Sequence, residues 1–186
     1  NGKSAKELTK TFNTSIGTSD RCDFIINKYS DLGYFLKMMM GNNIWVENNT
    51  YIISSTAGIQ ELIIDFNGST IILDDKVELK FFNCTLKNVK FDSDSVNGAF
   101  IRLSNCTLRD CTINGNIKLD ISDNNKITDS LITPDKDINI LFDSNILSNN
   151  TIRTPMVIPK AGNRNIISNN IISKLSITGG SSTLVN

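Results

Sequence analysis

The feature that most constrains the fold of this chain is an internal repeat of about twenty residues. The letters NCTL occur at residues 83–86 and again at 105–108, and the same register continues along the chain through further apolar residues. The aligned residues are Leu86, Leu108, Ile127, Leu147 and Ile172, at intervals of 22, 19, 20 and 25 residues. A self-similar unit of this length predicts a solenoid, in which each unit buries its apolar face against its neighbours.

Each unit also carries apolar residues at a spacing of five. Five positions before the aligned residues lie Phe81, Leu103, Ser122, Phe142 and Ile167, and five positions after them lie Phe91, Ile113, Ile132, Ile152 and Ile177. Asn, Asp, Ser and Gly fill the intervals, as they do in turns, and no stripe of helical period is sustained. The pattern therefore predicts short strands that stack from coil to coil at about 4.8 Å.

The predicted fold is all-β: a right-handed, single-stranded parallel β-helix of about six coils with an N-terminal helical cap. We expect residues 1–43 to form the helical segment and cap, and residues 44–186 to form the β-helix. Ser4 and Glu7 fit a capping box for a short helix towards Phe12, and the amphipathic stretch 24–40 is suited to cover the open end of the coils. The alternative is a four-sided pentapeptide-repeat helix, which requires coils of a constant twenty residues.

Two sets of side chains in the repeat, asparagines and cysteines, are predicted to have structural roles. Asn83, Asn105, Asn124 and Asn169 are expected to form one row of turns, because Asn tolerates left-handed backbone angles. Cys84, Cys106 and Cys111 precede inward residues by two positions, and so we expect them to fill the core as small hydrophobes. A disulfide between Cys84 and Cys106 is geometrically conceivable, but unpaired cysteines favour a reducing compartment.

Composition excludes several classes of function. The chain has 19 basic and 19 acidic residues and no histidine. The balanced charge argues against a nucleic acid or an anionic membrane as a partner, and apolar runs of about five residues are far short of the roughly 20 needed for membrane insertion. Without histidine, Ser-His-Asp catalysis and histidine-zinc sites cannot be built from this chain, and we predict no metal and no cofactor.

The segment that precedes the aligned coils resembles a known group of proteins. A stretch of the form G-x-x-I-x-V, followed by a turn and T-Y-x-I, is represented by Gly41, Ile44, Val46, Asn49, Thr50, Tyr51 and Ile53. A second stretch reads Ile64, Phe66, Asn67, Gly68, Ser69, Thr70 and Ile71. Over residues 20–177 the chain is similar to right-handed β-helices of the pectate-lyase-like superfamily, and among them to bacteriophage tailspikes and tail fibres. Asn49 stands where glycine is usual, and tailspike helices have about twice as many coils.

The resemblance implies candidate sites on the outer surface. Glycosidases of this type use a pair of carboxylates, and Asp110 and Asp129 align in successive coils at a suitable separation, although turns favour Asp for backbone reasons alone. A lyase would instead need a basic residue, for which Arg102, Arg109 and Lys118 are available. Trp45 and Tyr51 are candidates for a platform that binds sugar rings, with Arg109 as a polar contact.

Three functions follow as expectations. The first is a virion protein that recognises bacterial surface polysaccharide during host attachment, forms a homotrimer, contacts other tail proteins and is located in the virion tail after assembly in the host cytoplasm. The second is a small polysaccharide depolymerase on the same fold, and the third is a purely structural tail component. The chain begins at Asn1 without a methionine or a signal-like segment, and we expect it to be a fragment or a processed chain.

Overall fold

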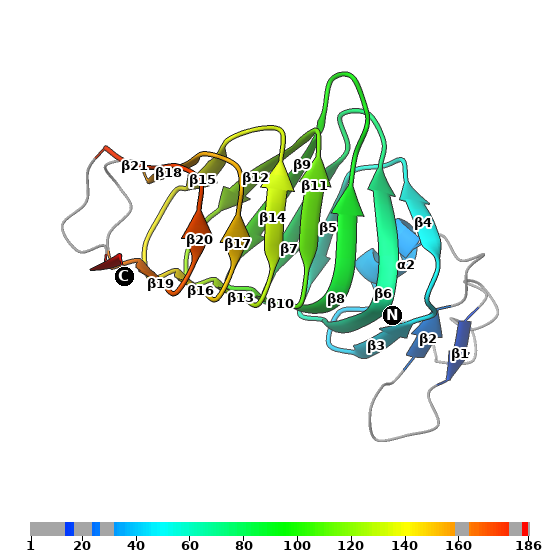
Figure 1. Cartoon of the computed structure of the whole chain (residues 1–186). Helices are drawn as coiled ribbons and strands as arrows, with labels where there is room; N and C mark the ends of the chain where they lie inside the picture. Colours follow the sequence, from blue (N-terminus) through cyan, green and yellow to red (C-terminus); the bar gives the residue numbers. More distant parts are fainter. Residues whose placement is uncertain (1–13, 17–23, 27–31, 159–163, 179–183, 186) are drawn as a thin grey trace.

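The chain folds into a parallel β-helix, in which short strands wind around one axis. This architecture comes from a computed structural model that describes residues 14–16, 24–26, 32–158, 164–178 and 184–185 (Figure 1). In Figure 1 the front strands point up, the strands behind return, and the chain advances from right to left, which is a right-handed winding. The predicted all-β parallel β-helix is therefore confirmed.

Each coil contributes strands to three faces. Face 1 contains β2 (Phe24–Ile26), β3 (Asn43–Val46), the first parts of β6 (Ile63–Leu73) and β8 (Thr85–Asp92), β10 (Thr107–Arg109), β13 (Lys126–Thr128), β16 (Ile146–Ser148), β19 (Ile166–Ser168) and β22 (Leu184–Val185). Face 2 contains β4 (Thr50–Ile53), the second parts of β6 and β8, β11 (Thr112–Gly115), β14 (Leu131–Pro134), β17 (Thr151–Ile152) and β20 (Ile171–Ile172). Face 3 contains β5 (Ala57–Gln60), β7 (Glu78–Phe82), β9 (Ala99–Ser104), β12 (Ile117–Ile121), β15 (Ile138–Ile140), β18 (Met156–Ile158) and β21 (Leu175–Ile177).

The number of coils follows from face 3. This face is a sheet of seven parallel strands, and six turns of the chain separate its first strand from its last. The prediction of about six coils is thus confirmed. Three strands per coil and unequal coil lengths also exclude the four-sided pentapeptide-repeat helix. In the described part of the chain, no helix is long and apolar enough to cross a membrane.

In the last coils, the strand register differs from the predicted repeat. Leu86, Leu108, Ile127 and Leu147 stack as expected, but the next residue in this row is Ile167. Ile172 stacks on Ile152 of face 2, so the last interval is 20 residues. The sequence alignment placed Ile172 in this row instead of Ile167, because the pairs Ile166-Ile167 and Ile171-Ile172 are five residues apart, which is also the spacing of apolar residues within a unit.

The row on face 3 also departs from the predicted spacing. Phe81 and Leu103 are followed by Ile121, Ile140 and Ile158, rather than by Ser122 and Phe142. Phe142 is 48% exposed, and Ile177 is exposed on β21, so their assignment to the core was wrong. The connection between face 3 and the following face 1 grows along the chain, and a fixed offset of five cannot follow it.

Two rows of left-handed residues form the corners on either side of face 1. The corner before face 1 contains Glu61, Asn83, Asn105, Asn124, Ser144 and Arg164, and the corner after it contains Asn67, Asn88, Asp110, Asp129, Asn149 and Asn169, all with φ between 50° and 63°. Positive φ is uncommon outside glycine, and Asn and Asp tolerate it best. The predicted asparagine row is confirmed for Asn83, Asn105 and Asn124, whereas Asn169 belongs to the second corner.

Next to most corner residues, an inward side chain continues a ladder inside the helix. Along the first corner this ladder is Cys84, Cys106, Asn125, Asn145 and Asn165, and along the second it includes Cys111, Ser130, Asn150 and Asn170. Each asparagine Oδ1 accepts the backbone N–H of the residue in the preceding coil, at 2.8 to 3.0 Å. The three cysteines are buried and free, which confirms that they fill the core.

The N-terminal end of the core is covered by α2 (Leu32–Met38), which packs against β4 and β5. Its apolar side, including Leu32, Phe35 and Leu36, is buried, so the helical cap is confirmed. The cap is shorter than the stretch 24–40, because Phe24–Ile26 form β2, which pairs with β3 in parallel and extends face 1. β2 is also paired with the antiparallel β1 (Thr14–Ile16). The predicted helix from Ser4 to Phe12 lies outside the described residues.

Candidate functional site

Face 1 presents two outward rows of side chains, because alternate residues of its strands point away from the core. One row contains Asn43, Ile63, Thr85, Thr107, Lys126, Ile146 and Ile166. The other contains Trp45, Asp65, Lys87, Arg109, Thr128, Ser148 and Ser168. Thus the outer surface of this face repeats coil by coil.

Two depressions lie next to each other along this face and share one lining residue. The larger, of about 490 Å³, is lined by Thr85, Lys87, Thr107, Arg109, Lys126, Thr128, Asp129, Ser148 and Asn149. The smaller, of about 310 Å³, is lined by Ile44, Trp45, Ile63, Asp65 and Lys87. Because Lys87 lines both, we call the two together the face-1 groove. From Trp45 to Ser148 it crosses five coil steps, or roughly 24 Å at 4.8 Å per step.

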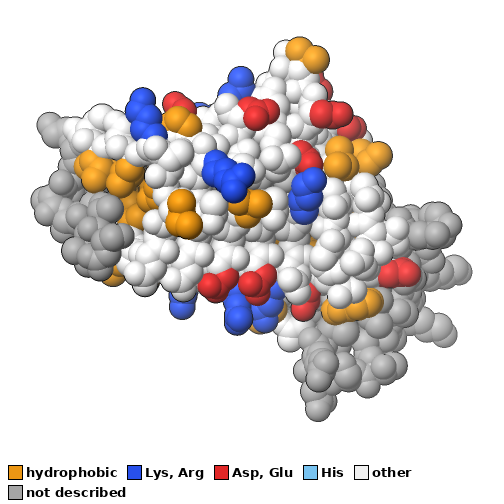
Figure 2. Space-filling model, in the orientation of Figure 1, with side chains coloured by type: hydrophobic (Ala, Val, Ile, Leu, Met, Phe, Trp, Pro, Cys, Tyr) orange, Lys and Arg blue, Asp and Glu red, His pale blue; other side chains and the backbone are white. Residues whose placement is uncertain are grey.

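Cations lie side by side in the middle of the groove. Lys87 and Arg109 are in register on neighbouring strands, and Lys126 follows Thr107 in the adjacent row. Among the described residues, only Arg109 of these three has an ion pair, in which its Nε lies 3.2 Å from Oδ2 of Asp110. Like charges opposite each other destabilise a sheet, so this cluster of cations favours an anion in the middle of the groove. The carboxylates of Asp65, opposite Lys87, and of Asp129 lie at other positions of the groove. Figure 2 shows basic and acidic side chains together along the lower edge, over β10 and β13.

Asp110 and Asp129 occupy the corner after face 1. They lie in successive coils with φ of 54° and 53°, and both are exposed. Asp129 lines the face-1 groove, and Asp110 is at its edge, paired with Arg109. Since every coil from Asn88 to Asn169 has Asn or Asp at this corner, the backbone conformation accounts for both carboxylates.

The two aromatic candidates have different environments. Trp45 is partly exposed at one end of the face-1 groove, which suits a platform for a sugar ring. Tyr51 is only 3% exposed, and its hydroxyl donates a 2.8 Å hydrogen bond to the carbonyl oxygen of Glu47. Burial and the charge of Glu47 raise the pKa of Tyr51 to about 12. The expectation that Tyr51 is an exposed platform is corrected, because it occupies an inward position of β4.

The other basic candidates lie elsewhere. Arg102 and Lys118 are on face 3, where both approach the buried carboxylate of Asp120. Sequence reasoning missed Lys87 and Lys126 as groove residues. Lys87 could have been found, because the repeat already aligns the pair Lys87-Asn88 with Arg109-Asp110, whereas Lys126 depends on the strand register.

No group of three or more Cys, Asp or Glu side chains in the described part of the chain is arranged to hold a metal ion. No protein-family model, curated protein or solved structure matches the chain. The parallel β-helix and its face-1 groove are therefore the observations from which a function must be argued.

Proposed function

We propose that this chain is a tailspike-like or tail-fibre-like virion protein that binds an extended anionic polysaccharide of the bacterial surface in the face-1 groove. The observation that carries the proposal is the register of the groove, in which a polar side chain recurs at every coil from Asp65 to Ser148, over four steps, and Trp45 occupies the coil before them. A polymer of repeating units that lies parallel to the axis would meet a hydrogen-bond donor at each step from Lys87 to Ser148. Small ligands would use only a fraction of this surface.

The chemistry of the groove fits a charged glycan. Lys87, Arg109 and Lys126 offer cations to carboxylate or phosphate groups of the polymer, and the hydroxyl groups of Thr85 and Thr107 exchange hydrogen bonds with sugar hydroxyls. At the N-terminal end of the groove, the indole of Trp45 can pack against the C–H face of a sugar ring.

Binding is favoured over hydrolysis by the surroundings of the carboxylates. A glycosidase needs one carboxylic acid whose pKa is raised and a second that stays ionised. Asp110 and Asp129 are both exposed at equivalent corners, and Asp110 is ion-paired with Arg109, so neither carboxylate has the apolar surroundings that a general acid uses. The depolymerase remains the second candidate, because Asp129 lines the groove itself.

The test is binding to purified capsular polysaccharide and lipopolysaccharide, measured on immobilised polymer at two salt concentrations. Lys87→Ala and Lys126→Ala should each weaken binding two- to fivefold, since a surface cation contributes about 0.5–1 kcal/mol, and the loss should shrink at high salt. Lys174→Ala, which removes an exposed lysine outside the groove, is the matched control. Equal binding by all three variants, or no binding to any polymer, would refute the proposal.

The same samples separate the alternatives. A depolymerase shortens the polymer, and Asp110→Asn or Asp129→Asn should then abolish the shortening. A purely structural tail component binds no glycan and associates only with other tail proteins. We further propose a homotrimer located in the virion tail, for which light scattering after size exclusion is the test; a monomer at micromolar concentration contradicts it.

A further inference from the structure

Two successive coils, from Ile64 to Leu86 and from Leu86 to Leu108, are longer than the coil that follows them, and this creates a step on the surface. Between Leu86 and Leu108 the chain uses 22 residues, whereas the next coil, from Leu108 to Ile127, uses 19. The additional length forms the loop 93–98, which projects at the top of Figures 1 and 2 and carries Val96, 93% exposed.

Hydrogen bonds hold this loop at its base. Ser93 Oγ donates to the carbonyl oxygen of Leu73 at 2.8 Å, and the backbone N–H of Asn97 donates to Oδ1 of Asp75 at 2.9 Å. From the following coil, Asn116 Nδ2 donates to the carbonyl oxygen of Ser95 at 2.8 Å. The loop is therefore anchored to both neighbouring coils and can form one wall of a fixed site.

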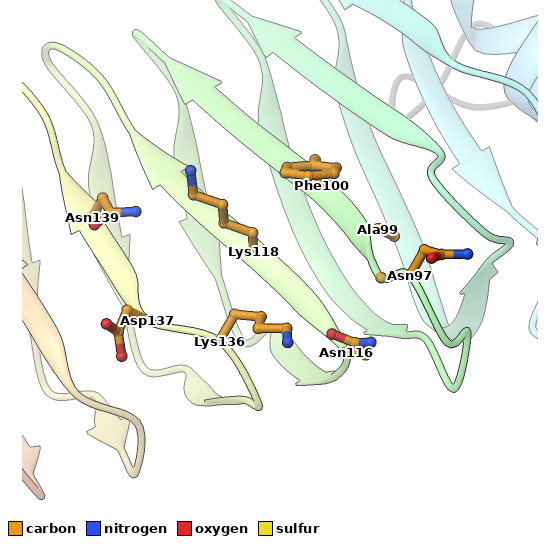
Figure 3. A pocket seen from close by; sticks show the side chains of 9 residues that line it. Asn97, Ala99, Phe100, Asn116, Lys118, Lys136, Asp137 and Asn139 are labelled. Carbon is orange, nitrogen blue, oxygen red and sulfur yellow. The ribbon is translucent and has the colours of Figure 1, made fainter.

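Below the loop, face 3 has a pocket of about 270 Å³, which we call the step pocket. It is lined by Asn97, Gly98, Ala99, Phe100, Asn116, Lys118, Lys136, Asp137 and Asn139 (Figure 3). It shares no residue with the face-1 groove. The ring of Phe100 offers an apolar surface among amide and ammonium groups, which is the usual composition of a small-ligand site.

Two polar groups of the step pocket have no partner among the described residues. Asn116 Oδ1 is buried and accepts no hydrogen bond, although its Nδ2 is fully used. Lys136 makes no ion pair with the described residues, and in Figure 3 its terminal nitrogen points towards Asn116. A buried acceptor without a donor is destabilising, and a turn of the Asn116 side chain towards the hydroxyl group of a bound ligand would remove that cost.

The charge around the pocket favours an anion. Asp120 is buried beside it, with Lys118 Nζ at 3.6 Å, and Asn139 Nδ2 donates to it at 3.0 Å. Arg102 Nε lies 3.8 Å from Asp120 but is shared with Glu78, whose Oε1 is closer at 2.7 Å. Asp137 is exposed, and in Figure 3 its carboxylate points away from the other lining side chains. The ammonium of Lys136 is thus left to a ligand.

We propose that the step pocket binds a single anionic sugar: a ring that packs on Phe100, an acidic group that pairs with Lys136, and a hydroxyl that donates to Asn116 Oδ1. The acidic group is a carboxylate or a phosphate, both of which lysine binds as a point charge. The site is independent of the face-1 groove, and a sugar here would be held as one residue rather than as a polymer.

The test is a titration of the ¹⁵N-labelled protein with glucuronate, glucose 6-phosphate, glucose and inorganic phosphate, followed by amide chemical shifts. We expect saturable shifts at Gly98, Asn116 and Lys136 with one or both acidic sugars, and at least fivefold weaker binding of glucose and of inorganic phosphate. The two acidic sugars distinguish a carboxylate from a phosphate. Equal binding of glucose, or binding of inorganic phosphate as tight as that of the sugars, overturns the proposal.

Variants separate this site from the proposed function. Lys136→Gln should remove the preference for the charged sugar, Lys136→Arg should retain it, and neither should change polymer binding in the face-1 groove. Lys87→Ala should have the opposite profile. If Lys136→Gln binds both sugars like the unaltered protein, the site is wrong even where polymer binding is confirmed. If no polymer binds but Lys136→Gln loses the acidic sugar, only the proposed function fails.

Discussion

Asn125 and Asn145 are joined twice between successive coils: both the backbone N–H and the side-chain Nδ2 of Asn125 donate to Oδ1 of Asn145, each at 2.9 Å. Asn145 repeats both bonds with Asn165. All three side chains are buried, and the backbone N–H groups of Asn125 and Asn145 each depend on the asparagine of the next coil.

Replacing the middle member should therefore be costly. Asn145→Ala leaves the buried backbone N–H of Asn125 without an acceptor, whereas Asn125 Nδ2 keeps the carbonyl oxygens of Leu103 and Asp123. At about 1–3 kcal/mol for an unsatisfied buried group, we expect a loss of about 2 kcal/mol in the free energy of unfolding. Urea denaturation measures it. Ser148→Ala, which changes an outward residue of the same strand β16, is the control and should change stability by less than 0.5 kcal/mol; a similar loss in both variants would show that the ladder is not the cause.

The corner residues should tolerate a change of charge but not of shape. Asp129 has φ of 53°, a conformation that Asn accepts and a β-branched residue does not. Asp129→Asn should leave the thermal midpoint nearly unchanged, whereas Asp129→Val should cost about 1–2 kcal/mol. Thermal unfolding of the two variants gives the comparison, and it also validates Asp129→Asn as a folded protein for the depolymerase assay.

The aromatic cluster should contribute strongly to the stability of the N-terminal coils. The ring centroid of Phe91 lies 6.1 Å from that of Phe66 and 5.9 Å from that of Phe81, and all three side chains are buried. Phe91→Ala should destabilise the protein by about 3–5 kcal/mol through the cavity that it leaves. Phe82→Ala is the matched control, because Phe82 is 46% exposed, and equal losses in urea would contradict this account.

The thiol of Cys111 should make the free energy of unfolding fall in alkaline solution. Burial raises the pKa of Cys111 from 9.0 to about 11. Between these pH values the unfolded chain loses the proton while the folded chain keeps it, so the free energy of unfolding falls with rising pH, by up to about 1.4 kcal/mol per unit. Below pH 9 this group has no such effect.

Cys111→Ser isolates this contribution, because serine occupies the same inner row at Ser130 and does not titrate in this range. Urea midpoints measured from pH 7 to 11 should decline less steeply above pH 9 in the variant than in the unaltered protein. Parallel curves over the whole range would mean that the thiol ionises equally in the folded and unfolded states.

The sequence predicted the part of the fold in which apolar and polar residues recur at fixed offsets from coil to coil. Leu86, Leu108, Ile127 and Leu147 are flanked by polar residues at fixed offsets, so their common register could be read directly. Phe142 could not be placed in this way, because an apolar residue in a connection of variable length has no neighbour that fixes its direction. The inner ladder was missed for a related reason: buried Asn145 follows a corner serine, and in sequence it looks like one more turn residue.

The groove was predicted only in part. Arg109 and Trp45 were identified from their residue types, and they prove to share one outward row. Tyr51 was misplaced, because its direction depends on whether β4 begins one residue earlier or later, and a shift of one residue exchanges the two sides of a strand. The step pocket could not be foreseen, since it depends on the difference in length between two coils.

The constant separation of the two corners of face 1 limits where residues can be inserted into this fold. From Asn83 onwards, the two left-handed corners of every coil are five residues apart, while the remainder of the coil varies in length. Insertions are therefore confined to the side away from the face-1 groove. A peptide added between Val96 and Asn97 would extend a loop that already projects, without altering the spacing of Lys87 and Arg109. The loops on one side of the helix can therefore vary in sequence and length, while the strands of face 1 keep the same spacing.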